Sequence, residues 1–527
     1  MKKYSFFSLL GSLSLLTSFD VAAQTSNIDP NAYGYYQDAL RFSQTKFGGS
    51  ARTLGVAGAV SALGADMGAT AANPAGLGLY KKSEFAGSLG VGFAGSETNY
   101  NNLTLRDNKA AANIPQLGIV FANPVRASDQ QQSGWRGGAF AITLTRMNNF
   151  QNRYSYDGNS PLQQQNGQYV NNSVMDYYND LMGKYSASVL NIDAENRNYE
   201  QDLLNSAYDS YIADVDTGTN ELYPIVPRGD LHQFGTVTTT GNQNQWDFAY
   251  GGNFDDRLYI GGAIGVATLS YQRESVYNET ITKVANNSYN AFNGFTFQVT
   301  DKLKVSGTGI NFKAGLIFRP TDFVRIGASI QSPTFYALNE TSHTDMSANF
   351  NGLQYGSTTL YNESAKGTEF KYDYSLRTPM KATGGIAFIL GKAGFVSFDA
   401  EYINYSNANL SVRNNTGSNM AADNRTINNL YKSVLNLRGG LELRYNVCRF
   451  RAGAAYYPDP YTNSTSNLKR DQLFITGGFG VRMPNYYVDM AVITNKFENS
   501  FQAHKYMDAI SVKNNYTNVV FTVGTFF

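Results

Sequence analysis

The sequence has few charged residues, almost no cysteine or histidine, and no long apolar run beyond its N-terminus. Charged residues make up 16% of the 527 residues, whereas an average soluble domain carries about 25%. The single cysteine, Cys448, cannot form an intrachain disulfide, and no Cys/His cluster has the spacing of a zinc site. A helical membrane protein would need stretches of about 20 apolar residues. These absences exclude a disulfide scaffold, a zinc domain and a helical membrane protein.

Glycine and aromatic residues are abundant instead. The chain has 50 glycines, 37 tyrosines and 33 phenylalanines, and its mean hydropathy is −0.34. A disordered chain would lack the aromatic residues. The strands of a transmembrane β-barrel present an apolar face by alternation, so they need no continuous apolar run. The composition therefore predicts a barrel of this kind.

The first 23 residues have the organisation of a secretory signal peptide. Lys2 and Lys3 precede an apolar stretch over 6–16, and small residues at 21–23 provide a cleavage site. We therefore expect residues 1–23 to be removed, which leaves 40 basic and 40 acidic residues. Because nucleic-acid binding usually requires a basic excess, nucleic acid is excluded as a partner.

Apolar and polar residues alternate through much of the chain after about residue 83. Leu435 and Leu437 lie on one face of an expected strand, and Asn436 and Arg438 lie on the other. The polar face must be wet or internally paired, and the apolar face suits either lipid or a soluble core. The same alternation recurs at 310–318, 324–330, 396–402, 450–456 and 473–483.

We predict fourteen strands and expect them to form an antiparallel barrel over residues 83–527. Most even-to-odd joins are tight, and the odd-to-even joins are longer, which is typical of short periplasmic turns and longer outer loops. A soluble sandwich has no reason to alternate so regularly. The predicted strands are 83–98, 114–124, 134–150, 234–254, 258–282, 304–319, 323–340, 368–390, 394–412, 431–446, 448–460, 470–484, 486–503 and 514–527.

The last predicted strand ends on the aromatic residue Phe527. A terminal aromatic on an outward apolar stripe resembles the signal read by the bacterial barrel-assembly machinery. We therefore expect that machinery and outer-membrane lipid as partners, and a multi-pass outer-membrane protein with both termini in the periplasm.

Residues 24–82 do not alternate and are dominated by Gly and Ala. Small residues permit close packing of short helices and turns in a confined space. A fourteen-stranded barrel is wider than the eight-stranded kind whose side chains fill the interior. We therefore predict that residues 24–82 form an N-terminal hatch, or plug, inside the lumen.

The sequence resembles the FadL-type outer-membrane transporters of long-chain fatty acids and other hydrophobic compounds. The resemblance covers nearly the whole mature chain. It rests on ARTLGVAGAVSALGADMGATAANPAGL at 51–77, FKAGLIFRPTDFVRIGASIQSPT at 312–334, MKATGGIAF and FVSFDAEYINYSNANL within 380–410, and LRGGLELRYNVCRFRAGAAYYPDP at 437–460. A long insertion at 151–233 departs from the family pattern.

The resemblance implies passive uptake of a hydrophobic ligand, without a nucleotide or an ion gradient. In the family, the ligand passes from outer loops to a luminal site, and rearrangement of the hatch and a kink in the third strand release it sideways into lipid. Asn73, Pro74 and Ala75 carry the hatch motif here. The glycines at the start of the third predicted strand are the candidates for the kink, or are ordinary barrel glycines: Gly134, Gly137 and Gly138.

Basic residues outnumber acidic ones among the predicted inward positions. Two interpretations stay open: the surplus attracts a carboxylate head group, or the residues form ion pairs across strands. The basic residues are Lys313, Arg325, Arg438, Arg444, Arg451 and Arg482, and the acidic ones are Asp399, Glu401, Glu442 and Asp489.

The insertion at 151–233 contains helix-like spacing. Helices there would either offer an apolar landing site or simply cover the barrel mouth. The residues expected on one face are Met175, Leu181, Met182, Tyr185 and Val189.

The sequence predicts no enzyme and no cofactor. The pattern GVGFAG at 90–95 matches a dinucleotide-binding motif, but it lies inside an expected strand. No serine lies in a nucleophile elbow, and the three histidines are far apart. The expected function is passive transport of hydrophobic compounds. The alternative is an interaction protein of the same fold that serves secretion or surface attachment.

Overall fold

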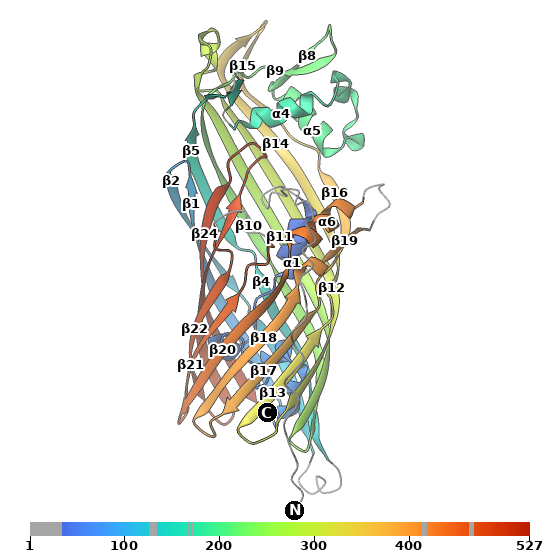
Figure 1. The fold of residues 1–527 in the computed structure, drawn as a ribbon, viewed down its shortest axis with the longest axis vertical. Helices are drawn as coiled ribbons and strands as arrows, with labels where there is room; N and C mark the ends of the chain where they lie inside the picture. The colour runs from blue at the N-terminus through green and yellow to red at the C-terminus, as the bar shows by residue number, and fades with distance from the viewer. Residues whose placement is uncertain (1–33, 126–133, 166–167, 171, 414–418, 463–467) are drawn as a thin grey trace, which may run out of the picture.

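Fourteen antiparallel strands close into a tall barrel (Figure 1). The computed structural model describes residues 34–125, 134–165, 168–170, 172–413, 419–462 and 468–527, so the expected signal peptide lies outside the described residues. Each strand pairs with the next, and the last pairs with the first. The ring confirms the predicted fold class. In order it contains β1 (Glu84–Tyr100), β3 (Gln116–Pro124), β4 (Trp135–Asn149), β10 (Gly229–Phe254), β11 (Leu258–Val284), β12 (Thr296–Phe318), β13 (Val324–Gln331), β17 (Lys381–Ile389), β18 (Gly394–Asn404), β20 (Ser433–Tyr445), β21 (Cys448–Tyr457), β22 (Gln472–Arg482), β23 (Tyr486–Phe501) and β24 (Ile510–Phe526).

The alternation in the sequence places apolar residues on the outer face. On β20, Leu435 and Leu437 are each 48% exposed, whereas Asn436 and Arg438 are buried on the inner face. The outer belt continues around the ring with large apolar side chains such as Phe140, Phe248, Ile264, Phe312, Phe398, Phe450 and Phe521. A belt of this composition suits lipid contact.

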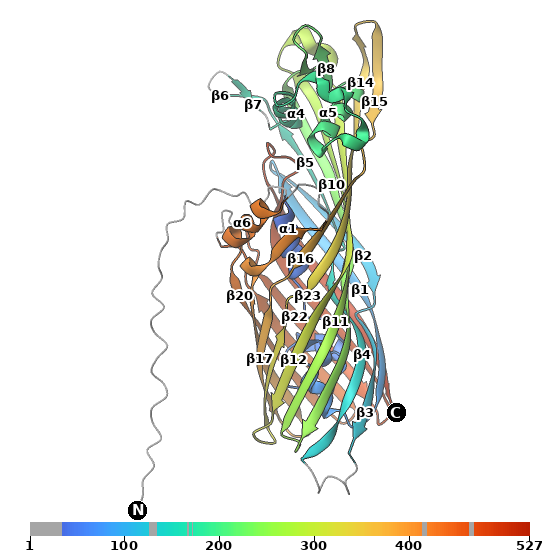
Figure 2. The ribbon, with the colours of Figure 1, turned by 90° about the vertical axis from the view of Figure 1, so that its right-hand side faces the viewer.

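The two ends of the barrel differ. The tight turns lie at one end together with Phe527, and the wall is much taller on one side of the other end (Figure 2). β10 and β11 have 26 and 27 residues, whereas β21 has ten. We call the two ends the short-turn end and the outer end. Additional strands extend the wall at the outer end: β2 (Leu103–Asn113), β5 (Asn152–Ser160), β14 (Phe335–Tyr355), β15 (Thr358–Ala365), β16 (Phe370–Arg377) and β19 (Asn409–Val412).

Three predicted strands are each broken into two, because local chemistry interrupts the ladder. Strand 323–340 breaks at Pro333 and strand 368–390 breaks at Pro379, since proline has no N–H to donate. Strand 394–412 breaks at the short helix η5 (Tyr405–Asn407). The predicted strands also omit β2, β5 and β15, whose polar outer-end sequences alternate weakly.

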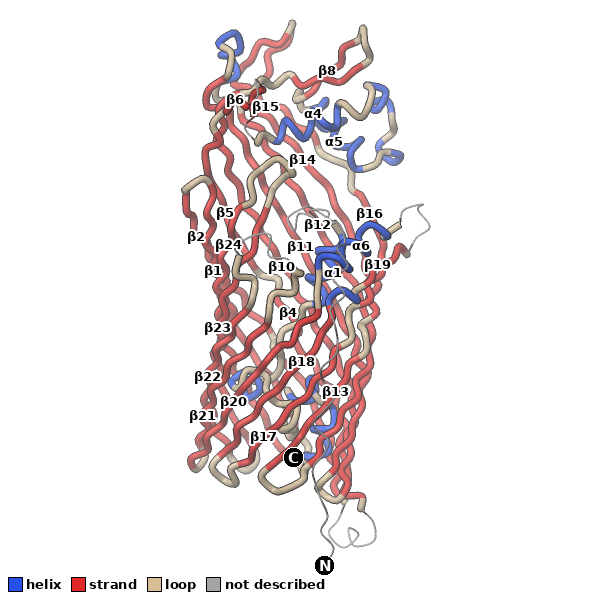
Figure 3. The backbone as a smooth tube through the Cα atoms, viewed as in Figure 1, coloured by secondary structure: helices blue, strands red, loops and turns tan. Residues whose placement is uncertain are grey.

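A small cap covers the tall side of the outer end (Figure 3). It contains α4 (Val174–Met182), η2 (Ala187–Asn191), η3 (Ala194–Asn196), α5 (Tyr199–Asp209) and the hairpin of β8 (Ala213–Asp216) and β9 (Glu221–Pro224). The hairpin of β6 (Gln163–Gln165) and β7 (Gln168–Val170) precedes it, and η4 (Asn287–Phe292) joins β11 to β12. Of the expected apolar face, Met175, Leu181, Met182 and Val189 are buried, and Tyr185 packs against the same cluster.

Residues 34–82 lie inside the barrel, and we call them the luminal segment (Figures 1 and 3). The segment contains α1 (Tyr35–Ser43), α2 (Ala51–Gly55), α3 (Ala69–Ala72) and η1 (Pro74–Leu79). It runs from the outer half, where α1 packs on α6 (Ala421–Leu430), to β1 at the short-turn end. No helix among the described residues is long and apolar enough to span a bilayer.

Candidate functional site in the barrel lumen

Asn73 fastens the luminal segment to the wall. Its side-chain nitrogen donates to the carbonyl oxygens of Ser61, Leu316 and Ala328, at 2.7, 3.1 and 3.3 Å. Its side-chain oxygen accepts from the N–H of Ala75 at 3.1 Å and so caps η1. Pro74 occupies the first position of η1, where a missing N–H costs nothing.

Glycines on the inner face of the wall let this motif approach closely. A Cβ atom on Gly315 would lie 1.9 Å from the side-chain oxygen of Asn73. A Cβ on Gly261 would lie 2.4 Å from the carbonyl carbon of Pro74, and one on Gly327 would lie 2.3 Å from Ser61 O. Only glycine fits at such contacts. Three neighbouring strands, β11, β12 and β13, therefore each place a glycine on the inner face where the wall contacts this part of the luminal segment.

Asp399 on β18 forms a second attachment point. One carboxylate oxygen accepts from the N–H groups of Val60 and Ser61, both at 3.0 Å, and the other accepts from the Ser61 hydroxyl at 2.6 Å. Three donors from the luminal segment therefore satisfy a buried wall carboxylate.

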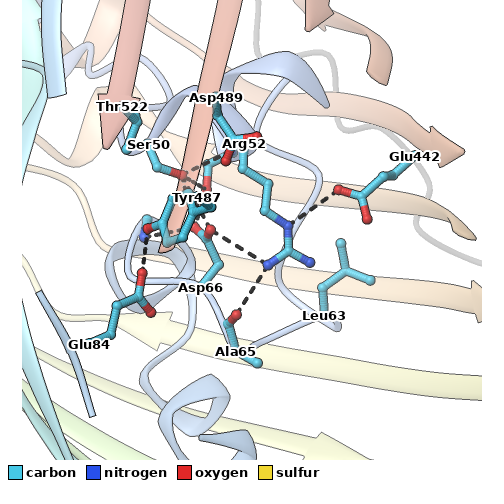
Figure 4. Close-up of polar contacts among 12 residues, drawn as sticks. Ser50, Arg52, Leu63, Ala65, Asp66, Glu84, Glu442, Tyr487, Asp489 and Thr522 are labelled. Atoms are coloured by element: carbon cyan, nitrogen blue, oxygen red, sulfur yellow. Dashed lines mark hydrogen bonds and ion pairs between the residues drawn. The ribbon is translucent and has the colours of Figure 1, made fainter. Parts of the chain in front are cut away.

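Arg52 joins the luminal segment to the wall through a charged cluster (Figure 4). Its guanidinium donates to the carbonyl oxygen of Ala65 at 3.1 Å and lies 3.6 Å from Asp66 Oδ2 and 3.4 Å from Glu442 Oε2. Within the segment, Asp66 also accepts from Ser50 Oγ, Thr53 Oγ1 and the N–H of Gly68, at 3.1, 2.8 and 2.8 Å.

The charges of the wall residues in this cluster balance one another. Arg451 donates to Glu442 at 2.8 Å and to Asp489 at 2.6 Å, and Arg444 donates to Glu442 at 2.8 Å. Two wall cations thus face two wall carboxylates, while Arg52 faces Asp66 within the segment. Separating the two parts would therefore leave each with its own counter-ions.

The six predicted luminal cations all project from inward positions, and four have carboxylate partners. Besides Arg444 and Arg451, Lys313 pairs with Asp247 at 3.0 Å and Arg438 pairs with Glu401 at 2.7 Å. The other two make different contacts: Arg325 donates to Leu63 O at 2.7 Å, and Arg482 lies 5.0 and 5.1 Å from the ring centroids of Tyr487 and Phe526. Lys313, Arg438 and Arg451 thus pair with carboxylates on other strands, whereas Arg444 pairs with Glu442 on its own strand, β20.

A cavity with a basic lining lies between the luminal segment and the inner wall. Its volume is about 60 Å³, which is room for a few water molecules. Of the described residues that line it, only Glu401 is acidic. Four cations line it, Lys46, Lys313, Lys381 and Arg438, beside the apolar side chains of Phe47, Val60 and Met147. This lining suits an anionic group next to an apolar one, and a larger molecule would require the luminal segment to move aside.

The structure places the three glycines of the predicted kink at the short-turn end of β4. Gly137 has a φ of +112°, and the register with β10 shifts next to it. Gly137 and Gly138 nevertheless pair with both β3 and β10, and Gly134 precedes the strand. The glycines therefore produce a bulge in a closed part of the wall.

Toward the outer end of β4, fewer backbone hydrogen bonds join neighbouring strands of the wall. The register shifts again where the Met147 carbonyl accepts a hydrogen bond from Lys46 N at 2.9 Å, and β4 then ends at Asn149, just before β5. Arg146 N still donates to Pro115 O at 2.9 Å, but farther toward the outer end, within the described residues, β2 pairs with β1 alone and β5 with β10 alone.

Side chains close the line between β2 and β5, which we call the seam. Between β2 and β5, Ser155 N donates to Asp107 at 2.7 Å, and Arg153 lies 3.6 Å from the same carboxylate. From the neighbouring strand β1, the hydroxyl groups of Ser96 and Thr98 donate to the carbonyl oxygens of Arg153 and Ser155 on β5, at 2.6 and 2.5 Å. Such bonds can break without disturbing a backbone ladder.

Sequence reasoning missed several residues of this site. Asp247 lies between the outward residues Trp246 and Phe248 of a predicted strand, so alternation alone would have placed it inside. Glu442 was predicted to face inward, but its pairing with Arg52 carries no sequence signal, because only the folded chain brings the two residues together.

Comparison with known proteins supports the fold. No protein-family model and no curated protein sequence matches the chain. Among solved structures, a FadL homologue from Pseudomonas aeruginosa is 13% identical with a TM-score of 0.52, and the match covers 92% of this chain and 98% of that one.

Two further structures are similar. The Ralstonia pickettii toluene transporter TbuX is 16% identical (TM-score 0.46, covering 91% and 99% of the two chains). The Pseudomonas putida toluene transporter TodX is 12% identical (TM-score 0.49, covering 91% and 98%). The likeness to the FadL homologue confirms, at the level of fold, the resemblance in the sequence: the chain has the FadL-type fold.

Proposed function

We propose that the chain is an outer-membrane channel that passively moves hydrophobic or amphipathic compounds. The luminal lining of four cations beside apolar side chains carries this proposal, because an amphipathic molecule would find an anion-binding and an apolar surface there once the luminal segment moves aside. The solved structures of similar fold include toluene transporters, which supports a hydrophobic ligand. No enzymatic activity and no cofactor are part of the proposal.

A long-chain fatty acid is the proposed ligand. Arg438 and Lys313 have carboxylate partners, but Lys381 donates to Thr45 Oγ1, and Lys46 lies 5.5 Å from the ring centroid of Tyr516. A carboxylate head group would therefore find two basic partners with no ion pair of their own in the described cavity. Its acyl chain would contact the apolar lining.

Release of the ligand requires the luminal segment to move, and we propose that the segment acts as a hatch. The balance of charge on each side of Arg52 and Glu442 supports this role, since separation strands no buried charge. The seam between β2 and β5 supports lateral release, because no backbone ladder joins the two strands.

Uptake experiments test the transport proposal. Cells with and without the gene would receive a labelled fatty acid and, separately, several neutral apolar compounds. We expect faster uptake of the fatty acid in cells that carry the gene. Equal rates for every compound in both strains would contradict the proposal.

The second candidate function is interaction with another protein, as in secretion or surface attachment. The cap favours it: residues 172–227 contain ten acidic and two basic residues, and Tyr199, Tyr208, Tyr211 and Tyr223 are exposed there. A pull-down that returns one stable partner, combined with normal uptake after deletion of the gene, would favour this function over transport.

A further inference from the structure

The lumen is divided into two zones of different chemistry. Along β12, Lys313 and Asn311 face inward nearer the short-turn end, and Val305 faces inward farther out. Along β18, Asp399 and Glu401 are followed outward by Ile403. The inner zone is thus polar and charged, and the outer zone is apolar.

The apolar zone is unusual for a barrel interior, which is normally polar. Its buried side chains come from six segments of the wall, each represented by one residue here: Phe150, Tyr271, Val305, Leu338, Tyr374 and Ile403. Without a cover, this surface would face water inside the mouth, at a cost proportional to its area.

Helix α1 is that cover. Ala39, Leu40 and Phe42 of α1 are buried in the same cluster. The Phe42 ring lies 5.9 Å from that of Tyr271 and 6.0 Å from that of Phe150, both in edge-on geometry. The chain's own helix therefore fills a site for an apolar guest.

Helix α1 also makes polar contacts with this site, and the one between Tyr374 and Asp38 is buried. Tyr374 donates to Asp38 at 2.9 Å, and Tyr35 donates to Glu340 at 3.0 Å. The N–H of Tyr36 donates to Asp423 of α6 at 3.1 Å.

The rest of the luminal segment is held differently from α1. Backbone groups and charges fasten Asn73, Ser61 and Arg52 to the wall, as described above. Beneath α1 the basic cavity begins, since Thr45, Lys46 and Phe47 line it directly after the helix ends. A guest in the place of α1 would therefore have its polar end over the cationic lining.

We infer that α1 is a displaceable lid, and that the surface beneath it binds the extended apolar chain of an amphipathic ligand. The inference rests on the proposed function, because it names the place where the ligand competes with the chain itself. Ligand binding and docking of α1 exclude one another, so a form with α1 locked in place binds ligand poorly.

A reversible lock tests the lid. A Cβ atom on Gly34 would lie 3.2 Å from Asp423 Oδ1 but 2.4 Å from the Tyr36 ring, so Tyr36→Ala is included in every variant of this experiment, controls included. The double variant Gly34→Cys and Asp423→Cys, built with Cys448→Ser, would therefore join α1 to α6 by a disulfide. We expect purified protein to bind fluorescent palmitate at least about tenfold more weakly when oxidised than after reduction of the same sample. The single-cysteine variants are the matched controls and should not respond to oxidation.

A loosened lid gives the opposite result. Tyr35→Phe with Tyr374→Phe removes the hydroxyl donors to Glu340 and Asp38 and keeps both rings and the ion pair of Asp38 with Arg41, so palmitate should bind roughly threefold or more tightly. A cysteine at Leu40 should react faster with a water-soluble maleimide when palmitate is present. Loss of folding would not produce tighter palmitate binding together with palmitate-dependent labelling at position 40.

The outcomes separate this inference from the proposed function. Equal palmitate binding by the oxidised and reduced forms, with unchanged labelling at Leu40→Cys, overturns the lid and leaves transport intact. Absence of palmitate binding and uptake in every form overturns the proposed function, and the lid with it.

Discussion

Arg52 in the luminal segment and Glu442 in the wall lie 3.4 Å apart, between Arg52 Nε and Glu442 Oε2. This ion pair is the charged link between two clusters that each carry their own counter-ions. A substitution in the luminal segment and a substitution in the wall should therefore affect the stability of the barrel differently.

Arg52→Ala should loosen the luminal segment with little effect on the barrel. Glu442 keeps Arg444 and Arg451, and Asp66 keeps three neutral donors. We expect a larger leak of small hydrophilic molecules through the outer membrane and a melting temperature near that of the unmodified protein. The melting temperature can be read from the shift of the folded band in gel electrophoresis.

Arg451→Ala is the contrasting variant. It leaves Asp489 buried without its cation, a situation that costs about 3–5 kcal/mol. The melting temperature should fall clearly. If Arg52→Ala destabilises the barrel as much as Arg451→Ala, the two clusters are not independent.

Gly315→Ala should displace the hatch motif. The added Cβ would lie 1.9 Å from Asn73 Oδ1, so Asn73 has to leave its three carbonyl partners. We expect the luminal segment to become more accessible to protease. Gly384→Ala is the matched control, because nothing lies within 4 Å of a Cβ at that outward position. Adding Asn73→Ala to Gly315→Ala should relieve the clash, and protease resistance that is unchanged in Gly315→Ala would contradict the arrangement.

Lys381→Met should weaken binding of a carboxylate ligand and spare a neutral one. Lys381 lines the cavity and is without an ion pair in the described residues, so its loss removes attraction to an anion and strands no partner charge. We expect palmitate to bind roughly tenfold more weakly, a difference of about 1.4 kcal/mol. The affinity for the corresponding alcohol should change less than twofold, and equal losses for both compounds would exclude a role in head-group recognition.

A cross-link across the seam should block lateral release. The side chains of Asp107 on β2 and Arg153 on β5 meet at 3.6 Å, so cysteines at positions 107 and 153, in the Cys448→Ser background, lie within reach of a short bifunctional reagent. Palmitate binding should persist while uptake by cells falls. A cross-linked protein with normal uptake would show that the ligand leaves by another route.

Acid should loosen the loop between β23 and β24. Burial lowers the pKa of His504 in this loop to about 3, and its ring packs edge-on against Tyr277. In the open loop the histidine has an ordinary pKa of about 6.5. Below that pH the open loop binds a proton and the packed loop does not, so protonation favours the open loop. The stability of the packed loop is therefore full above pH 6.5 and falls as the pH drops toward 3.

Hydrogen exchange over residues 502–509 measures this effect. At pH 5 the packed loop should lose about 2 kcal/mol relative to pH 8, after correction for the intrinsic exchange rate. His504→Phe keeps an aromatic ring beside Tyr277 and removes the titration, so its protection should not change with pH. A pH dependence that persists in His504→Phe would assign the effect to another group.

The alternation around Leu435 and Arg438 was enough to predict the strands and their faces, because a period of two is a local property. The tight joins were enough to indicate a membrane barrel with unequal ends. The breaks at Pro333 and Pro379 were also readable from sequence, since proline interrupts a ladder wherever it stands. The contacts of Asn73, Arg52 and Asp399 could not be predicted from the sequence, because each of these residues binds partners hundreds of residues away.

The sequence by itself determined the strand pattern and the apolar outer face, which follow from hydrogen bonding and side-chain period within each segment. It also marked the small-residue stretch that can enter a confined space. Only the tertiary structure decided which wall glycines receive Asn73, which carboxylates neutralise the inward cations, and that α1 covers an apolar zone at the mouth. Closure of the barrel brings distant strands into one ring, and the energies of burial and ion pairing exist only between groups that this closure has made neighbours.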